Sequence, residues 1–273
     1  MVIQHNIAAI NSYRNLSTNQ SALSKNLEKL SSGYKINRAG DDAAGLAISE
    51  TMRSQINGLN QAVNNANDAI GLIQTAEGAM TETHSMLQRM KTLTTQAANG
   101  TYTQTARANI KAEIDALNKE ITRIATTTEF NGEKPLNPEK TGNLTFFIGA
   151  SAATANAMTV AQQTMTAKYL KVDGISVNNT TNAFKAMASV DAAIETVSTY
   201  RATLGAAQNR LEHTVNNLKV TSENITSAES RIRDTDMADE ITAYTKNNIL
   251  LQAAQSMLSQ SNAMPQGVLS MLQ

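Results

Sequence analysis

Cysteine and tryptophan are absent from this chain, and proline and aromatic residues are rare. The 273 residues include three prolines, and aromatic residues make up only 4% of the total. Without cysteine the chain cannot form disulfide bonds, thiolate zinc sites or a cysteine nucleophile. Aromatic side chains normally supply much of the buried area of a globular core. A core made instead of Leu, Ile, Val, Met and Ala suits helices that pack along their length.

An excess of charge of either sign is missing as well. Lys and Arg together number 23, as do Asp and Glu, so the formal net charge is zero. This balance gives no reason to expect nucleic acid or an anionic membrane as a partner. No apolar run reaches the ~18 residues that a membrane-spanning helix requires, so we expect no membrane insertion. Residues 1–7 lack the basic start and apolar core of a cleaved signal peptide, and none is expected.

Apolar residues recur at helical spacing in the N-terminal part of the chain. A first stripe with spacings of three, four and seven runs to Leu30, where residues 31–33 (SSG) end the predicted helix. Asp41 and Asp42 then offer N-cap carboxylates to a second helix that runs to Asn99. That helix would be roughly 85 Å long at about 1.5 Å per residue, too long for the core of a sphere.

Heptad seams occur in three further segments. Apolar residues alternate at spacings of four and three between residues 52 and 73 and again between residues 110 and 124. A third run on a 3.5-residue register extends from Val190 to Ile232, and a phase break follows at residues 234–236. The last predicted helix begins at Met237. The sequence therefore predicts a mainly α fold, with a long antiparallel coiled-coil-like rod built from the N- and C-terminal segments.

The middle of the chain follows a different pattern. Asn-Gly at residues 131–132 and prolines at 135 and 138 break the helical pattern. Residues 144–148 alternate as in a short strand, and residues 169–175 are a second strand candidate. The small, polar stretch 151–165 has no assignment. A small β-hairpin region near 140–178 is expected.

The terminal helices are amphipathic and separated by most of the chain. Two such helices can pair along one seam, but apolar surface then remains on their outer sides, and exposed apolar stripes mark partner surfaces. We therefore expect the ends to be covered by copies of the same chain. The predicted assembly seam comprises Ile3, Ile7, Ile10, Leu23, Leu27, Leu30, Met237, Ile241, Tyr244, Leu251 and Leu258.

Motifs for catalysis or metal binding are not found. His5, His84 and His213 have no second histidine at helical spacing, and no G-x-S-x-G elbow occurs. Residues 40–45 (GDDAAG) lack the Lys-Ser/Thr pair of a phosphate loop, and their carboxylates would repel phosphate. We expect no enzyme activity, catalytic residue, cofactor or metal. A coiled-coil adaptor that does not polymerise remains an alternative.

Several blocks closely resemble the bacterial flagellin family. At the N-terminal end these are residues 27–33 (LEKLSSG) and 36–48 (INRAGDDAAGLAI), followed by 74–79 (QTAEGA). Towards the other end they are residues 208–214 (QNRLEHT), 228–234 (AESRIRD), 253–258 (AAQSML) and 265–269 (PQGVL). The resemblance covers roughly residues 1–135 and 182–273, and the short interval between them is similar to that of a minimal flagellin without outer domains.

The resemblance implies a structural subunit that self-assembles through its terminal and rod helices into the extracellular flagellar filament, a helical tube used for swimming. Residues 1–40 and 235–273 are then expected to form an inner domain of paired helices, and residues 41–234 the surrounding rod domain. Implied partners are identical subunits, an export chaperone on the C-terminal helix, and the filament cap and hook-junction proteins. Type III export without a cleaved signal is also implied. The related hook–filament junction protein is the alternative.

Flagellins also carry a motif that is read by Toll-like receptor 5 of animal hosts. It corresponds here to residues 87–93 (LQRMKTL), with Arg89, Leu93 and Glu113 matching the usual contact residues. Lys91 and Thr92 stand where the family commonly has Arg and Glu. The change from Arg to Lys loses bidentate geometry, and the change from Glu to Thr loses a charge. Receptor binding is therefore implied, with a signalling strength that the sequence does not determine.

Overall fold

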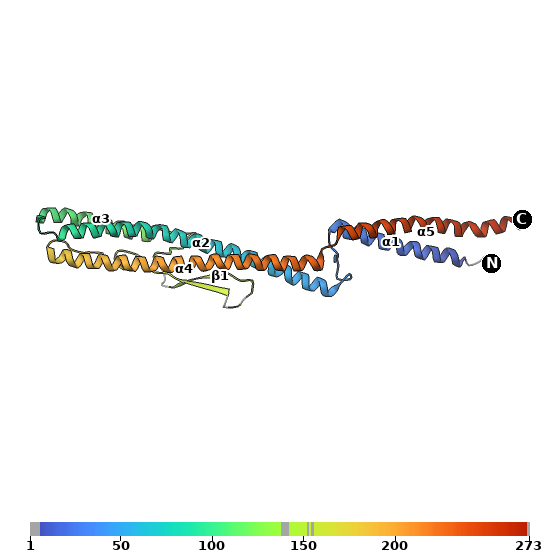
Figure 1. Cartoon of the computed structure of the whole chain (residues 1–273), viewed down its shortest axis with the longest axis horizontal. Helices are drawn as coiled ribbons and strands as arrows, with labels where there is room; N and C mark the ends of the chain where they lie inside the picture. The colour runs from blue at the N-terminus through green and yellow to red at the C-terminus, as the bar shows by residue number, and fades with distance from the viewer. Residues whose placement is uncertain (1–5, 138–141, 152, 154–155, 272–273) are drawn as a thin grey trace. The chain divides into compact units, whose positions relative to one another are not determined.

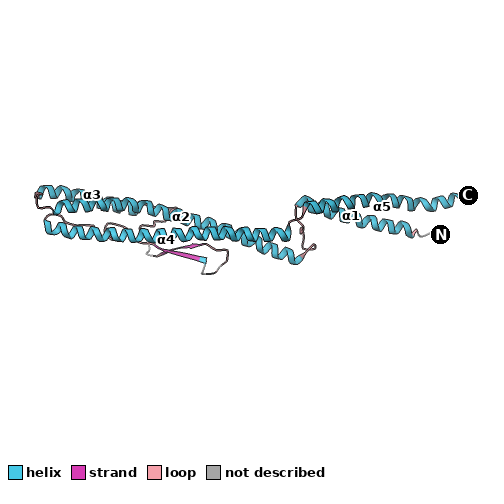
Figure 2. Cartoon of the chain, in the orientation of Figure 1, coloured by secondary structure: helices cyan, strands magenta, loops and turns pink. Residues whose placement is uncertain are grey.

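The computed structural model describes residues 6–137, 142–151, 153 and 156–271. These residues form mainly helices, with one small two-stranded sheet (Figure 2). In chain order (Figure 1) the elements are α1 (Ile7–Ser32), α2 (Ala43–Ala98), α3 (Gln104–Thr127), β1 (Asn143–Phe147), β2 (Ala157–Ala161), α4 (Thr180–Arg233) and α5 (Met237–Met271). The prediction of a mainly α fold with long antiparallel helices and a small β-hairpin is confirmed.

Two compact units divide the chain. The terminal unit comprises residues 1–55 and 223–273, and the central unit comprises residues 56–222. The terminal unit thus holds α1 and α5 with the first residues of α2 and the last of α4. The division predicted at residues 40 and 235 concerns layers of an assembly, and it stays a prediction.

Helices α2 and α4 run antiparallel in the central unit. Asn60 lies beside Ser222, Glu77 is 3.4 Å from Arg201, and Lys91 is 2.7 Å from Asp191. Residues further along α2 therefore meet residues further back along α4. Helix α3 returns along α2, where the Arg107 side chain donates to the Ala97 carbonyl at 3.0 Å.

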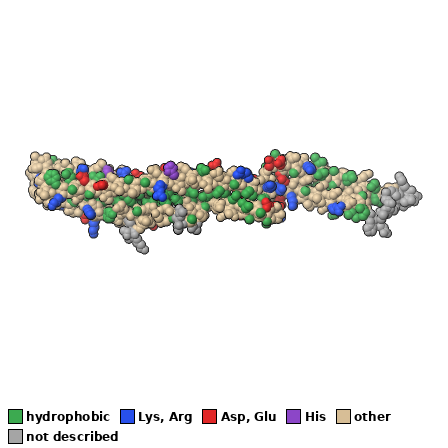
Figure 3. All heavy atoms as spheres, turned by 60° about the horizontal axis from the view of Figure 1, so that its bottom comes forward, with side chains coloured by type: hydrophobic (Ala, Val, Ile, Leu, Met, Phe, Trp, Pro, Cys, Tyr) green, Lys and Arg blue, Asp and Glu red, His purple; other side chains and the backbone are tan. Residues whose placement is uncertain are grey.

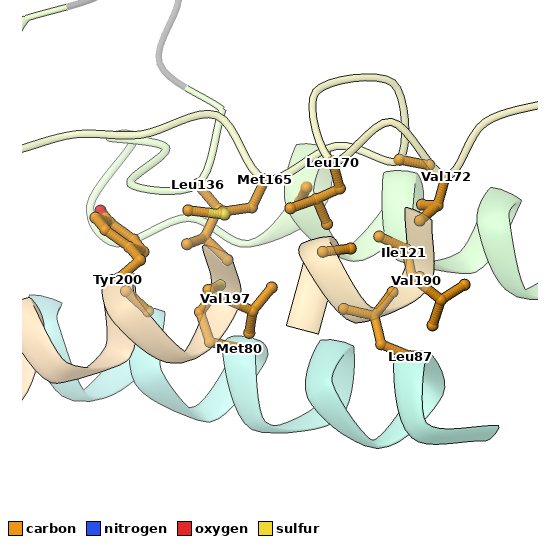
Figure 4. Packing of buried hydrophobic residues seen from close by; sticks show 14 of the residues in the cluster. Met80, Leu87, Ile121, Leu136, Met165, Leu170, Val172, Val190, Val197 and Tyr200 are labelled. Carbon is orange, nitrogen blue, oxygen red and sulfur yellow. The ribbon is translucent and has the colours of Figure 1, made fainter. Parts of the chain in front are cut away.

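Aliphatic side chains and methionines fill the core of the central unit. Met80 and Leu87 of α2, Ile121 of α3, and Val190 and Val197 of α4 converge in it (Figure 4). All five side chains are fully buried. Residues between the regular elements close this core, namely Leu136, Met165, Leu170 and Val172 (Figure 4). Most predicted seam positions of α3 and α4, such as Ile121, Val190 and Val197, belong to this core, whereas Met80 and Leu87 lie outside the seam predicted in α2 between residues 52 and 73.

Strands β1 and β2 form an antiparallel pair in which Asn143 lies opposite Ala161 and Phe147 opposite Ala157. A two-stranded hairpin alone is marginally stable in water. Met158 is buried, and Phe146 and Val160 pack against the core of the central unit, which supplies the missing support. The prediction of a strand at 144–148 is confirmed within one residue.

The second predicted strand, residues 169–175, is wrong. This segment is an irregular turn in which Lys171 and Gly174 have positive φ, and β2 lies instead in the unassigned stretch 151–165. Leu170 and Val172 are buried because the turn inserts them into the core, and Asn118 donates to the Val172 carbonyl at 2.7 Å. The alternating pattern correctly indicated that Leu170 and Val172 are buried, but these residues lie in a turn and not in a strand.

Candidate assembly surface on the terminal helices

Helix α1 has a defined start and a defined end. The Asn6 side chain accepts from the Ala9 amide at 3.1 Å and so caps the first turn. At the other end Gly33 adopts a left-handed conformation with φ of 75°, and its N–H bonds the Lys29 carbonyl at 2.8 Å. A residue without Cβ meets this geometry at least cost, so the predicted stop at residues 31–33 is confirmed.

Helix α5 begins at an aspartate cap. The Asp236 carboxylate accepts from the backbone N–H of Ala238 at 2.9 Å and of Asp239 at 3.4 Å. Asp239 and Glu240 follow in the first turn, where negative charge favours the helix dipole. The phase break that the sequence predicts at residues 234–236 is therefore the start of a new helix.

The two terminal helices pair antiparallel along their length (Figure 1). The Asn6 side chain donates to the Ser261 carbonyl at 2.8 Å, and Lys29 lies 3.8 Å from Glu240. At the near end of the pair, where α1 ends and α5 begins, the Lys35 backbone N–H donates to the Arg233 carbonyl at 2.6 Å. These contacts fix one register for the pair.

A cluster of polar contacts surrounds the near end of the pair, and all of it lies in the terminal unit. The Arg233 guanidinium stacks 4.7 Å above the Tyr34 ring and lies 3.1 Å from the Glu50 carboxylate. Ser49, which is buried, donates to Glu229 at 2.9 Å. The cluster ties the start of α2 and the end of α4 to the terminal helices.

The face where α1 and α5 meet is small and partly polar. Five predicted seam residues lie half-buried there, namely Leu23, Leu30, Tyr244, Leu251 and Leu258. Between them lie small or amide side chains that are half-buried or buried, including Ala9, Ser12, Asn19, Asn26, Ala243, Asn247, Ala254 and Ser261. Such a face brings the backbones close but buries few large apolar groups.

The other predicted seam residues point outward. Ile7, Ile10, Leu27, Met237 and Ile241 keep between 46% and 61% of their surface exposed. Hydrophobic side chains are accordingly visible on the terminal helices, at the right in Figure 3. Ile3 lies outside the described residues. The single seam expected from the sequence is thus two faces, a buried pairing face and an exposed outer face.

Four further residues belong to the outer face and were not predicted. Ile249, Leu250, Met257 and Met264 of α5 are exposed to at least 41%. The seven-residue spacing of Leu250, Met257 and Met264 places them on one stripe, and this signal is present in the sequence. Helix α5 is apolar on several sides, so periodicity alone did not separate its inner from its outer face.

The residues of the predicted receptor motif lie on α2 and α3. Arg89 and Glu113 form an exposed ion pair, with 2.8 Å between a guanidinium nitrogen and the carboxylate. Leu93 is only 2% exposed and packs in the core of the central unit. The structure therefore brings Arg89 and Glu113 together on the surface and places Leu93 beneath it. The receptor role of these residues stays a prediction.

Chemistry-bearing clusters are scarce in the parts of the chain that the structure describes. In those parts no group of three or more potential metal ligands occurs, and no helix is both long and apolar enough to cross a membrane. His84 lies beside Gln88, with 2.9 Å between their side-chain nitrogens, and so sits in an ordinary intrahelical contact. The apolar outer face of α1 and α5 is the feature that most needs a partner.

Family patterns, related sequences and a solved structure all point to the same protein family. The sequence pattern described as bacterial flagellin N-terminal helical region matches residues 3–141, and that of the bacterial flagellin C-terminal helical region matches residues 187–272. The chain is 51% identical to flagellin of Bacillus subtilis (strain 168) and 47% identical to flagellin of Halalkalibacterium halodurans, over the full length of all three proteins. The crystal structure of Bacillus cereus flagellin is also similar. Its TM-score is 0.51 at 30% identity, and the match covers 61% of this chain and 94% of that one.

Proposed function

Since the chain belongs to the bacterial flagellin family, it is a structural subunit of the flagellar filament, and we propose that it joins the filament through the outer faces of α1 and α5. The relatives and the family patterns do not favour the alternative of a hook–filament junction protein. Membership of a structural family is consistent with the absence of enzyme activity, and we expect none. Flagellar filament components are extracellular.

The outer face of the terminal helices carries the proposal. Full burial of one Leu or Ile side chain contributes about 1.5–3 kcal/mol. Burying the exposed apolar residues of α1 and α5 would therefore contribute a large favourable free energy, which lateral packing of identical subunits would supply. The pairing face contributes less, because it is small and partly polar. This difference supports a terminal unit that becomes fully stable only after assembly.

The layer assignment follows from this proposal. Residues 1–40 and 235–273 would form the inner domain of the filament, and residues 41–234 the surrounding rod domain with the β-hairpin. The apolar outer face lies entirely in the first set, which supports its burial at the centre. The cluster around Arg233 and Tyr34 would then connect the two layers within each subunit.

Partners other than identical subunits are inferred from the family. An export chaperone would cover the apolar surface of α5 before assembly, and the filament cap and hook-junction proteins would contact subunits at the two ends. Export would use the flagellar type III route and remove no signal. The exposed Ile249, Leu250 and Met257 support a chaperone, because an unassembled subunit needs this stripe covered.

Substitution on the outer face tests the assembly proposal. We expect Ile7→Ser with Ile10→Ser to abolish or strongly slow filament growth from seeds, measured by sedimentation and electron microscopy. Both side chains are exposed, so circular dichroism should show unchanged helix content.

Phe184→Ser provides the control for this test. Phe184 is also exposed, but it lies on α4 in the central unit, so its loss should leave growth intact. Growth of the double variant at the wild-type rate would refute the role of the outer face.

We also propose that Arg89 and Glu113 present the receptor motif. Their ion pair holds the two charges side by side on neighbouring helices, where a partner can contact both. Arg89→Ala should weaken binding to the immobilised ectodomain of Toll-like receptor 5 by about tenfold, the loss of roughly one charged hydrogen bond. Arg123→Ala, which removes a different exposed ion pair on α3, should not change it. Equal affinities for all three proteins would exclude Arg89 as a contact and leave the filament proposal intact.

A further inference from the structure

The most exposed and the most buried methionines lie in different units. Among the side chains that the structure describes, the exposed methionines are Met237, Met257 and Met264, with 46% to 61% of their surface accessible, and all three lie on α5. Met80, Met90, Met158 and Met165 lie in the central core and are at most 5% exposed. Met52, Met86 and Met187 are half-buried, so the chain carries an accessible set on α5, a protected set in the central core and three thioethers of intermediate exposure.

The accessible set belongs to the exposed apolar surface of α5 but not to a single stripe, because Met237 stands seven residues before the half-buried Tyr244. Met257 and Met264 continue the stripe that starts at Leu250, and Met237 is accompanied by Ile241, which is also exposed. An unbranched thioether packs well against irregular apolar surfaces, so methionine suits a face that must fit several neighbours. Oxidation to the sulfoxide makes the same side chain polar and disrupts such interfaces.

From this distribution we infer that Met237, Met257 and Met264 form a peroxide-sensitive modification site, whose oxidation prevents an unassembled subunit from joining the filament. The inference rests on the proposed role of the outer face of α5. A peroxide transfers one oxygen atom to the thioether sulfur, which loses two electrons. The O–O bond breaks, the S–O bond forms, and hydrogen peroxide leaves as water.

Burial decides which molecules are sensitive. In the free subunit the three thioethers face solvent, whereas packing between subunits would cover them. The sulfoxide oxygen is a hydrogen-bond acceptor, and burying an acceptor without a donor costs free energy. Oxidation should therefore block addition of new subunits while leaving an existing filament in place.

The experiment compares free subunits and finished filaments after treatment with hydrogen peroxide and removal of the excess by catalase. Peptide mapping by mass spectrometry should find sulfoxide at the three α5 positions in subunits, and little at Met80, Met90, Met158 or Met165. Growth from seeds should slow by about tenfold or more with unchanged helix content. In filaments the α5 positions should oxidise at least about tenfold more slowly.

Two controls keep the result specific. The triple variant Met237→Leu, Met257→Leu, Met264→Leu conserves volume and apolar character, and it should grow normally before and after peroxide. Treatment of oxidised wild type with methionine sulfoxide reductases for both epimers should restore growth. If the variant itself cannot grow, this reductase treatment decides the question, and failure to restore growth overturns the inference.

Two further results would refute the inference about methionine oxidation. Oxidised subunits that grow at the untreated rate, with sulfoxide verified at the three positions, would refute the inference, as would equal sensitivity of the triple variant. Failure of untreated wild type to grow from seeds would count against the proposed function instead, and it is seen before any oxidant is added.

Discussion

At the scale of single residues, two neighbouring aspartates show how similar side chains take different roles. The sequence predicts that Asp41 and Asp42 both cap α2, but only Asp42 does so, with its carboxylate accepting from the Gly45 amide at 2.9 Å. Asp41 accepts from the backbone N–H groups of Arg38 and Asn37 in the preceding turn. These hydrogen bonds, that of Arg38 first, lower the pKa of Asp41. The stability that they contribute is present at neutral pH and is lost as pH falls through the lowered value.

Tyr200 has a raised pKa, and its contribution to stability is lost as pH rises rather than as it falls. Burial raises the pKa of Tyr200, because the ionised phenolate would lose its hydration in the core. The resulting stability is complete below the ordinary tyrosine pKa of about 10 and is lost as pH rises above it. Tyr200→Phe should therefore flatten the alkaline loss of stability. At neutral pH it should cost only about 0.5–1.5 kcal/mol, because the bond from the hydroxyl to the Ala161 carbonyl is long, at 3.4 Å.

Urea unfolding at several pH values between neutral and strongly alkaline measures this effect. Tyr169→Phe is the control, since Tyr169 is exposed and its replacement should leave the alkaline slope unchanged. An alkaline slope that is the same for wild type and the Tyr200 variant would show that another group is responsible.

At the scale of elements, backbone geometry explains both the successes and the failure of sequence reasoning. Helix ends were predictable because their causes are local, as in the glycine at 33 and the aspartate before α5. The strand predicted at residues 169–175 failed because two buried side chains in a turn imitate strand alternation. Strand β2 was missed because its residues, 157–161, are mostly small, and tertiary packing through Met158 decides their conformation.

Two glycines of the central unit separate backbone effects from packing. A Cβ at Gly174 or at Gly205 would meet no other atom within 4 Å, but Gly174 has φ of +68° whereas Gly205 lies inside α4. We expect Gly174→Ala to lower the free energy of unfolding by about 1 kcal/mol and Gly205→Ala to raise it by about 0.5–1 kcal/mol. Urea denaturation of both variants checks the opposite signs. A destabilising Gly205→Ala would mean that helix propensity is not the governing effect there.

At the scale of the whole molecule, the sequence indicated which side chains are buried in the central unit better than it did for the terminal helices. Heptad positions identified much of the core of the central unit, because its helices bury large apolar residues at regular intervals, but they missed Met80 and Leu87 in the second half of α2. The terminal helices bury Ala, Ser and Asn against each other and expose Ile, Leu and Met. A hydrophobicity pattern alone cannot show which of two apolar sides faces the intramolecular neighbour, so the predicted seam combined residues of both.

Removal of residues 1–32 should separate the roles of the two units. The core cluster runs from Val63 to Val215 within the described residues, so the central unit should remain folded without α1. Its thermal transition should shift by less than about 4 °C, the displacement expected from 1 kcal/mol in a unit of this size. Filament growth should be lost. Calorimetry and sedimentation measure the two effects, and a truncated chain that still polymerised would contradict the terminal-helix proposal.

The fixed register of the antiparallel pairs restricts how the length of this protein can change during evolution. Asn6 is held opposite Ser261 and Lys29 opposite Glu240, so a heptad deleted from α1 would leave its counterpart in α5 without a neighbour. The same holds for α2 and α4, which are held together at Glu77 and Arg201. Tolerated insertions and deletions in these helices should therefore come as compensating pairs in distant parts of the gene, whereas the connection between α3 and α4 can lengthen on its own.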